Sequence, residues 1–113
     1  MECEPPYDVV TTSGVTIVSP NYPNFYDDNI SCQLTLTFDV KVSIEFETFY
    51  TDSSDHLEVR DGDSSSSRLI GTVDGPDTPS PMESTGRSMT LVFSSNYNYG
   101  YSGFRIIANE GKN

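Results

Sequence analysis

The carboxylates in the middle of the chain are the residues best suited to chemistry. Seven acidic residues lie between Glu45 and Asp63, and Arg60 is the only Lys or Arg among them. Asp52 and Asp55 flank a serine-rich turn in this run. Carboxylate oxygens are common metal ligands, so the pair could bind a metal ion. Turns also attract Asp, and an acidic run is commonly a solvated face, so both interpretations stay open.

A second group of candidates lies near the C-terminus, where Tyr97, Tyr99 and Tyr101 alternate with Asn98 and Gly100. Exposed tyrosine rings suit contact with a protein or a sugar, because each combines apolar area with a polar tip. The same rings could instead pack over an edge of a β-sandwich. Phe25 and Tyr50 would join this end if the fold brings them there.

The two cysteines, Cys3 and Cys32, and the one histidine, His56, are too few to close a zinc site with nitrogen and sulfur ligands alone. They are either two free thiols or one disulfide, which would close a loop of about 30 residues and contribute roughly 3–4 kcal/mol. The disulfide is favoured because Asn29-Ile30-Ser31 is an N-glycosylation sequon, which also indicates an oxidising compartment.

Catalysis has little support in the sequence. Asp55 and His56 are adjacent, and adjacent side chains on a strand point to opposite faces, so they cannot form an Asp–His relay. No G-x-S-x-G elbow or glycine-rich phosphate loop occurs. We therefore expect a chain that is not an enzyme.

Composition excludes several partners. The 113 residues carry 17 acids and 6 Lys or Arg, a formal net charge of −11. A polyanion repels phosphate backbones and anionic membrane surfaces, so we expect no nucleic-acid binding. No apolar run is long enough for direct membrane insertion. The length predicts a single domain over residues 1–113.

The elements that must position these residues are strands, because apolar and polar residues alternate with a period of two. The alternating segments are 15–18, 32–38, 42–47, 56–60, 69–73, 88–94 and 104–108. Turn residues separate them, and 64–67 and 74–81 are expected loops. Seven or eight short strands predict an all-β antiparallel sandwich. The expected core consists of Leu34, Leu36, Ile44, Phe46, Leu57, Val59, Leu91, Phe93, Phe104 and Ile106.

Several ordered motifs give the chain, from Cys3 to about Ile107, a resemblance to the CUB domain family. Residues 19–23 read SPNYP, residues 55–62 read DHLEVRDG, and residues 91–96 with 103–104 read LVFSSN and GF. The resemblance implies a jelly-roll-like β-sandwich. It also implies a disulfide between Cys3 and Cys32, because Cys32 stands where the family has the second cysteine of its first pair.

The chain departs from the family in lacking the second cysteine pair. The family carries its third cysteine after the strand that ends near Phe49, and Asp74 stands near the fourth position. The resemblance therefore implies a looser loop around residues 50–54, unless another contact clamps it.

The family resemblance also implies a calcium site at this end. Carried over, its positions are Tyr26, Asp52, Asp55 and Asn96, with carbonyls from Tyr97 and Asn98. The family has Glu where Asp52 stands and Asp where Asn96 stands. Calcium takes roughly six to eight oxygens, so a site with two carboxylates should bind it more weakly than one with three.

The function implied is that of a non-catalytic extracellular module, secreted or on a cell-surface ectodomain, that mediates protein–protein interaction with the help of Ca²⁺. The partner would be basic, and its Lys or Arg would reach Asp52 and Asp55, with contacts from Tyr26, Tyr97 and Tyr99. One alternative is a stand-alone carbohydrate-binding domain like the spermadhesins, and another is an exosite domain of a larger secreted protease.

Overall fold

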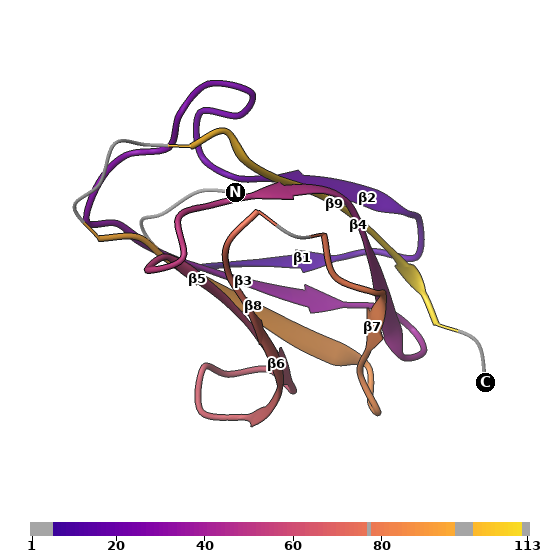
Figure 1. The fold of residues 1–113 in the computed structure, drawn as a ribbon. Helices are drawn as coiled ribbons and strands as arrows, with labels where there is room; N and C mark the ends of the chain where they lie inside the picture. Colours follow the sequence, from indigo (N-terminus) through magenta and orange to yellow (C-terminus); the bar gives the residue numbers. More distant parts are fainter. Residues whose placement is uncertain (1–5, 77, 97–100, 112–113) are drawn as a thin grey trace.

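The computed structural model describes residues 6–76, 78–96 and 101–111, and these residues form a β-sandwich (Figure 1). Its strands are β1 (Tyr7–Val10), β2 (Val15–Val18), β3 (Ser31–Thr37), β4 (Val42–Tyr50), β5 (His56–Asp61), β6 (Arg68–Val73), β7 (Met82–Glu83), β8 (Ser88–Ser94) and β9 (Gly103–Glu110). In the described part of the chain no helix is long and apolar enough to cross a membrane.

The strands form two sheets. The larger has the order β1-β3-β8-β5-β6 and the smaller the order β2-β9-β4-β7. Every pair is antiparallel except β1 and β3, which run parallel. The predicted all-β sandwich is confirmed. Two short strands, β1 and β7, were not among the seven alternating segments and extend the sheets at their edges.

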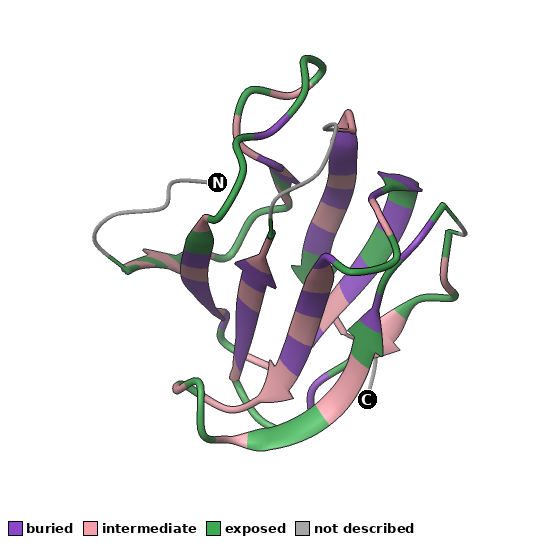
Figure 2. Cartoon of the chain, turned by 60° about the vertical axis from the view of Figure 1, so that its left-hand side comes forward, coloured by how far each residue is buried: buried purple, intermediate pink, exposed green. Residues whose placement is uncertain are grey.

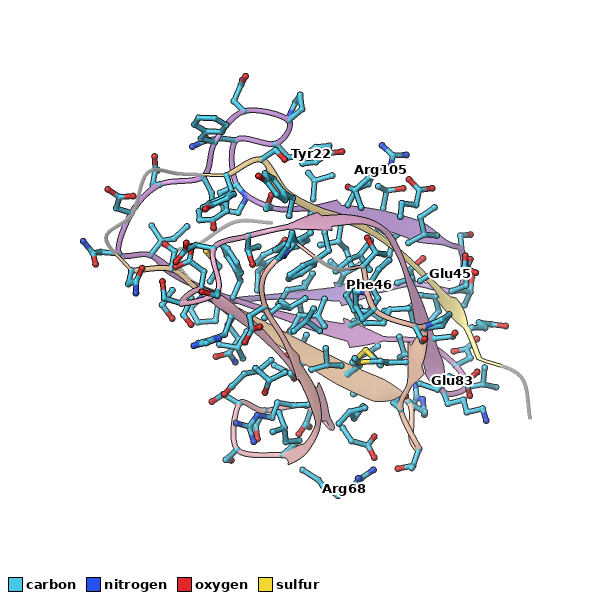
Figure 3. All side chains as sticks on the ribbon, in the orientation of Figure 1. Tyr22, Glu45, Phe46, Arg68, Glu83 and Arg105 are labelled. Carbon is cyan, nitrogen blue, oxygen red and sulfur yellow. The ribbon has the colours of Figure 1, made fainter. Side chains whose placement is uncertain are left out.

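The core lies between the sheets, where the apolar residue of each alternating pair points inward. Figure 2 shows the resulting bands of buried and less buried residues along the strands. In Figure 3, Phe46 lies among the interior side chains, whereas its neighbour Glu45 is exposed. All ten residues of the predicted core are buried, so the period of two located the inner face correctly.

Aromatic rings fill the part of the core nearest the candidate site. Phe93 meets Phe104 edge-on with ring centroids 5.1 Å apart, and Phe104 stacks on Phe49 at 5.7 Å. Cys32 is fully buried and disulfide-bonded, which excludes the alternative of two free thiols. Cys3, its predicted partner, lies outside the described residues. These packed rings give the adjoining loops a rigid base.

Strand β5 positions the acidic residues. It lies between β8 and β6 in the larger sheet, with Asp55 immediately before its first residue and Asp61 as its last. The two aspartates therefore lie at opposite ends of one strand. The end at Asp55 also receives the loop that follows β4 and the segment that follows β8.

Candidate functional site

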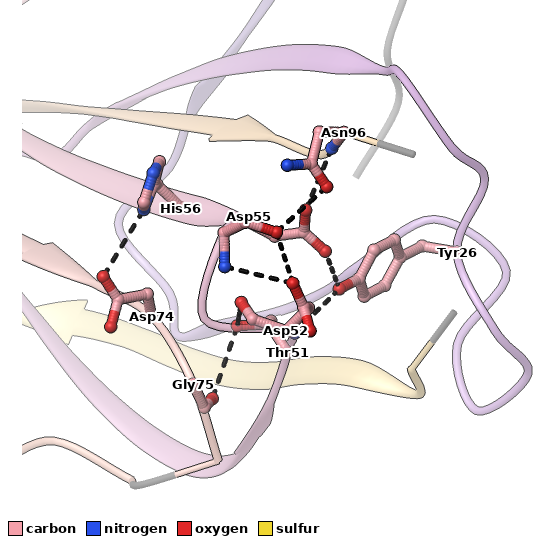
Figure 4. Close-up of polar contacts among 9 residues, drawn as sticks. Tyr26, Thr51, Asp52, Asp55, His56, Asp74, Gly75 and Asn96 are labelled. Atoms are coloured by element: carbon pink, nitrogen blue, oxygen red, sulfur yellow. Dashed lines mark hydrogen bonds and ion pairs between the residues drawn. The ribbon is translucent and has the colours of Figure 1, made fainter. Parts of the chain in front are cut away.

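Four predicted site residues converge at the Asp55 end of the sandwich (Figure 4). Tyr26 precedes β3, Asp52 and Asp55 lie between β4 and β5, and Asn96 follows β8. We call this group, together with Ser54 and Tyr101, the acidic end. No pocket is found among the described residues of this end.

Asp55 is the buried centre of the acidic end, with an exposed fraction of 0%. The Tyr26 hydroxyl donates a short hydrogen bond to Asp55 Oδ2. The Asn96 backbone N–H donates to the other carboxylate oxygen, Oδ1, at 2.9 Å. A buried carboxylate needs such donors, and together they fix its orientation.

Tyr26 is held in place by both backbone and ring contacts. Its N–H donates to the Tyr101 carbonyl at 3.1 Å, and its ring packs edge-on against Phe93 with centroids 5.0 Å apart. Burial, and then the hydrogen bond to Asp55, raise the pKa of Tyr26 well above its ordinary value. The phenol therefore stays protonated and remains a donor to Asp55.

Asp52 is the more accessible carboxylate. Its Oδ2 accepts a bond from the Ser54 N–H at 3.1 Å and a short bond from the Ser54 hydroxyl, and its Oδ1 accepts one from the Tyr101 hydroxyl at 3.3 Å. The hydrogen bonds from Ser54 lower the pKa of Asp52. Asp52 is therefore ionised at neutral pH and is held, among the described residues, by neutral donors.

A hydrogen-bonded clamp holds the loop that was expected to be looser. The N–H of the buried Thr51 donates to the Gly75 carbonyl at 3.0 Å, and its hydroxyl lies 3.3 Å from the same oxygen and 3.2 Å from the Asp52 carbonyl. Gly75 has a φ of +77°, which glycine adopts at no steric cost. His56 Nδ1 also lies 3.4 Å from Asp74 Oδ2. These contacts join the two loops where the family has its second cysteine pair.

Ser54 was missed as a site residue, and Tyr101 was a candidate only for contact with a partner. Ser54 donates to Asp52, and its hydroxyl oxygen also lies 3.0 Å from Asn96 Oδ1. Tyr101 bonds Asp52 and meets the ring of Tyr50 edge-on, with centroids 4.9 Å apart. The alternating tyrosines were the available signal for Tyr101, whereas Ser54 resembled any serine in a polar turn.

Three predicted positions, Tyr97, Asn98 and Tyr99, lie outside the described residues. Phe25 is 63% exposed and Tyr50 is 48% exposed. Asn29 is exposed on the turn before β3, and its N–H donates to the Asn96 carbonyl at 3.3 Å. The glycosylation sequon therefore borders the acidic end.

The donors at the acidic end are all oxygens. The described residues contain no cluster of three or more His, Cys, Asp or Glu that could hold a metal. Asp52, Asp55 and the side-chain oxygen of Asn96 nevertheless offer carboxylate and amide oxygens from converging loops. This set fits a hard cation such as calcium better than a transition metal.

Comparisons with known proteins point to one family. A family model of the CUB domain matches residues 3–107. Neuropilin and tolloid-like protein 2 of Mus musculus is 38% identical over 109 residues, which cover 86% of this chain and 20% of that protein. Human cubilin is 35% identical over 106 residues, which cover 88% of this chain and 3% of that protein. The chain thus spans a fifth or less of these two relatives.

Among solved structures, the MASP-1 CUB2 domain bound to Ca²⁺ superposes with a TM-score of 0.77 at 24% identity. The superposition covers 91% of this chain and 96% of that one. At this level of identity the likeness establishes a shared fold.

Proposed function

The chain belongs to the CUB domain family, an extracellular and non-catalytic class of protein-interaction modules, and we propose that its acidic end binds a basic side chain of a protein partner with the help of calcium. The proposal covers the domain alone. It does not extend to the activities of a longer protein that contains this domain, because the chain matches only part of each relative.

The observation that carries the proposal is the state of Asp52. It is a partly exposed, ionised carboxylate beside the buried Asp55, and its described partners are neutral hydroxyl and amide groups. An ammonium or guanidinium group from outside can therefore approach it. The net charge of −11 would steer such a partner and make association faster at low salt.

The described basic residues of the chain are engaged elsewhere in the fold. Their contacts are Lys41 with Glu83, Arg60 with Glu58, Arg68 with Asp61, Arg105 with Glu47, and Arg87 with the Phe38 carbonyl. Asp52 therefore has no competing ion pair within the described chain, which favours a cation supplied by a partner.

Calcium would be held by Asp52, Asp55 and the Asn96 side-chain oxygen. Tyr26 would orient Asp55 through its hydroxyl, and Ser54 would orient Asp52 and Asn96. A bound ion would supply positive charge between the two carboxylates and tie the 52–55 loop to the segment after β8. With two carboxylates in the set, affinity should be modest.

Thermal unfolding in EGTA, in calcium and in magnesium tests the metal. At about a hundredfold excess over the dissociation constant a ligand stabilises the folded state by ~2.7 kcal/mol. For a domain of this size that raises Tm by about 10 °C. Asp52→Asn should abolish the calcium shift, and Asp39→Asn, an exposed acid in the β3–β4 turn, should retain it. An absence of any shift in calcium would contradict the metal proposal.

A short lysine-rich peptide, titrated calorimetrically at low and high salt, tests the basic partner. Asp52→Asn should weaken binding in calcium more than Asp39→Asn does, although both remove one charge. Equal losses would mean that the peptide senses overall charge only, which would contradict a specific role for the acidic end.

A carbohydrate ligand is the second candidate, favoured by the exposed Tyr50 ring and its edge-on contact with Tyr101 beside Asp52. Such rings stack on the apolar faces of sugars. A neutral glycan array would reveal this activity, and Tyr50→Ala should abolish it. Sulfated glycans are poor candidates, because the chain is strongly acidic.

A further inference from the structure

The residues of the glycosylation sequon lie on an accessible turn. Asn29 is exposed and adopts a left-handed conformation with a φ of 54°, which Asn tolerates better than most residues. Among the described residues, none forms a hydrogen bond with the Asn29 side chain. Ser31, the hydroxyl residue of the sequon, is exposed at the first position of β3. The acceptor amide is therefore available for modification.

The turn extends the pairing of β3 with β8 toward the acidic end. Ser31 pairs with Ser94, the Ser95 N–H donates to the Ile30 carbonyl at 2.9 Å, and the Asn29 N–H reaches the Asn96 carbonyl. Asn29 is therefore one strand spacing from Asn96.

Strand β5, which pairs with the other edge of β8, leads from this turn to the loop that carries Asp52. On the other side of β8, His56 pairs with Ser94, and the Ser54 hydroxyl oxygen lies 3.0 Å from Asn96 Oδ1. Adjacent strands lie about 4.8 Å apart, so the Asn29 and Ser54 backbones are about 10 Å apart. A glycan on Asn29 would begin within this distance of the acidic end.

We infer that Asn29 carries an N-linked glycan that borders the acidic end and restricts the size of partner that reaches it. The regulatory half of this inference rests on the proposed function, because it concerns access to the same carboxylates. A calcium ion would pass beside the glycan freely. A folded partner would be admitted only where its basic side chain projects from a narrow protrusion.

The modification is a group transfer from a polyprenyl-diphosphate-linked oligosaccharide, catalysed by a transferase of the secretory pathway. A C–N bond forms between Asn29 Nδ2 and the anomeric carbon of the first sugar. The bond from that carbon to the diphosphate oxygen breaks, and the polyprenyl diphosphate leaves with the electron pair. The amide nitrogen loses one proton to a base of the transferase, and no oxidation or reduction takes place.

Secretion from eukaryotic cells followed by intact-mass measurement tests the acceptor. The natural sequence and Ser31→Thr, which keeps the sequon, should carry a glycan that peptide N-glycosidase removes. Ser31→Ala, which destroys the sequon without altering Asn29, should carry none. An unmodified Ser31→Thr protein, or a glycan that persists in Ser31→Ala, would overturn the assignment.

Labelling of an added cysteine tests the restriction. Ser53→Cys places a thiol on the exposed turn between Asp52 and Asp55, and Ser65→Cys places one on the exposed serine loop after β5. A maleimide on a long polyethylene glycol chain should label Ser53→Cys severalfold more slowly when the glycan is present than in the Ser31→Ala background. N-ethylmaleimide, which is small, should label both forms at the same rate, and Ser65→Cys should be insensitive to the glycan.

The outcomes separate this inference from the proposed function. Equal labelling of Ser53→Cys by the long reagent, with and without glycan, would overturn the restriction even if calcium still stabilises the protein. A calcium response that is absent in every form would contradict the metal proposal and leave the glycan result intact.

Discussion

Strand β5 carries an aspartate at each end, and the two carboxylates are satisfied in different ways. Arg68 forms an ion pair with Asp61, and Figure 3 shows Arg68 on the opposite side of the molecule from Tyr22. Asp61, whose side chain is 6% exposed, accepts bonds at 2.8 Å from Arg68 Nη2 and from the N–H and hydroxyl of Thr85. The chain thus neutralises this carboxylate with its own cation and uses it to join two turns.

The Asp55 carboxylate is bonded instead by a phenol and a backbone amide, those of Tyr26 and Asn96. The partly exposed Asp52, next to it, is likewise bonded by neutral donors among the described residues. One residue type thus has two kinds of partner in this chain. The carboxylate bonded by a cation of its own chain joins two turns of the fold, whereas the carboxylates oriented by neutral donors are, on the proposed function, the ones that receive a cation from outside.

Replacement of the two aspartates gives the largest expected effect. Asp55→Ala leaves the buried Tyr26 hydroxyl and the Asn96 N–H without their carboxylate acceptor. It should lower the free energy of unfolding by about 3 kcal/mol, since each stranded buried group costs about 1–3 kcal/mol. Asp61→Ala should cost about 2 kcal/mol, because the freed Arg68 side chain is 67% exposed and can be solvated.

Urea unfolding in EGTA measures both values. EGTA matters because bound calcium would add its own contribution at the acidic end and obscure the comparison. A smaller loss for Asp55→Ala than for Asp61→Ala would contradict the view that the Asp55 carboxylate is the more deeply integrated of the two.

The dependence of stability on pH should separate the two ends. Although burial alone would raise the pKa of Asp61, the hydrogen bonds from Thr85 and the charge of Arg68 hold it below its ordinary value. Its contribution is therefore present above the unfolded pKa of about 3.9 and is lost as pH falls through the lower folded value. Asp61→Asn should reduce the loss of stability at acid pH only in part. The remaining loss comes from groups such as Asp52, whose pKa is also lowered.

At alkaline pH the dependence of stability on pH should come mainly from the Asp55 end. The pKa of Tyr26 is raised by burial and by its bond to Asp55, so its contribution is present below the unfolded pKa of about 10 and is lost as pH rises above it. Tyr26→Phe should flatten this limb, and Tyr22→Phe is the control. Unfolding measured across pH for the variants checks both limbs, and an alkaline limb unchanged by Tyr26→Phe would contradict the assignment.

The sequence was informative wherever a repeating pattern or several ordered motifs constrained it. A period of two located the ten core residues, and the family motifs placed Tyr26, Asp52, Asp55 and Asn96 at one end, where the structure brings them together. Strand β7 was missed because two residues cannot show a period. Strand β1 was missed because its pairing with β3 depends on tertiary context.

The parts of the site that depend on single hydroxyl groups could not be predicted. Ser54 and Thr51 are residue types found in any polar turn. Their roles depend on where the folded loops place each hydroxyl oxygen. The expectation of a looser loop at residues 50–54 rested on the missing cysteines. It included the condition that another contact could clamp the loop, and the bonds from Thr51 to Gly75 meet that condition.

Removal of the Thr51 hydroxyl tests this clamp and gives the smallest expected effect. Thr51→Val keeps the shape of the side chain and the backbone bond to Gly75, and loses only the hydroxyl. Because Thr51 is 1% exposed, water does not readily replace the lost donor, and stability should fall by about 1 kcal/mol. The exposed Thr85→Val, which removes a hydroxyl from the Asp61 end, is the matched control.

Hydrogen exchange distinguishes a local clamp from a general loss of stability. The Asp55 N–H donates to the Asp52 carbonyl at 3.0 Å, so its exchange reports whether the 52–55 turn remains closed. In Thr51→Val this amide should exchange faster than the fall in global stability alone explains. The exchange rates of the central amides of β8 should change only as much as the global free energy of unfolding changes. Thr85→Val should leave the Asp55 amide unaffected beyond that global change. If Thr51→Val and Thr85→Val alter the Asp55 amide equally, the hydroxyl does not substitute for the absent disulfide, and the order of the acidic end comes from its other hydrogen bonds, which include those of Tyr26, Asn96 and the Thr51 N–H.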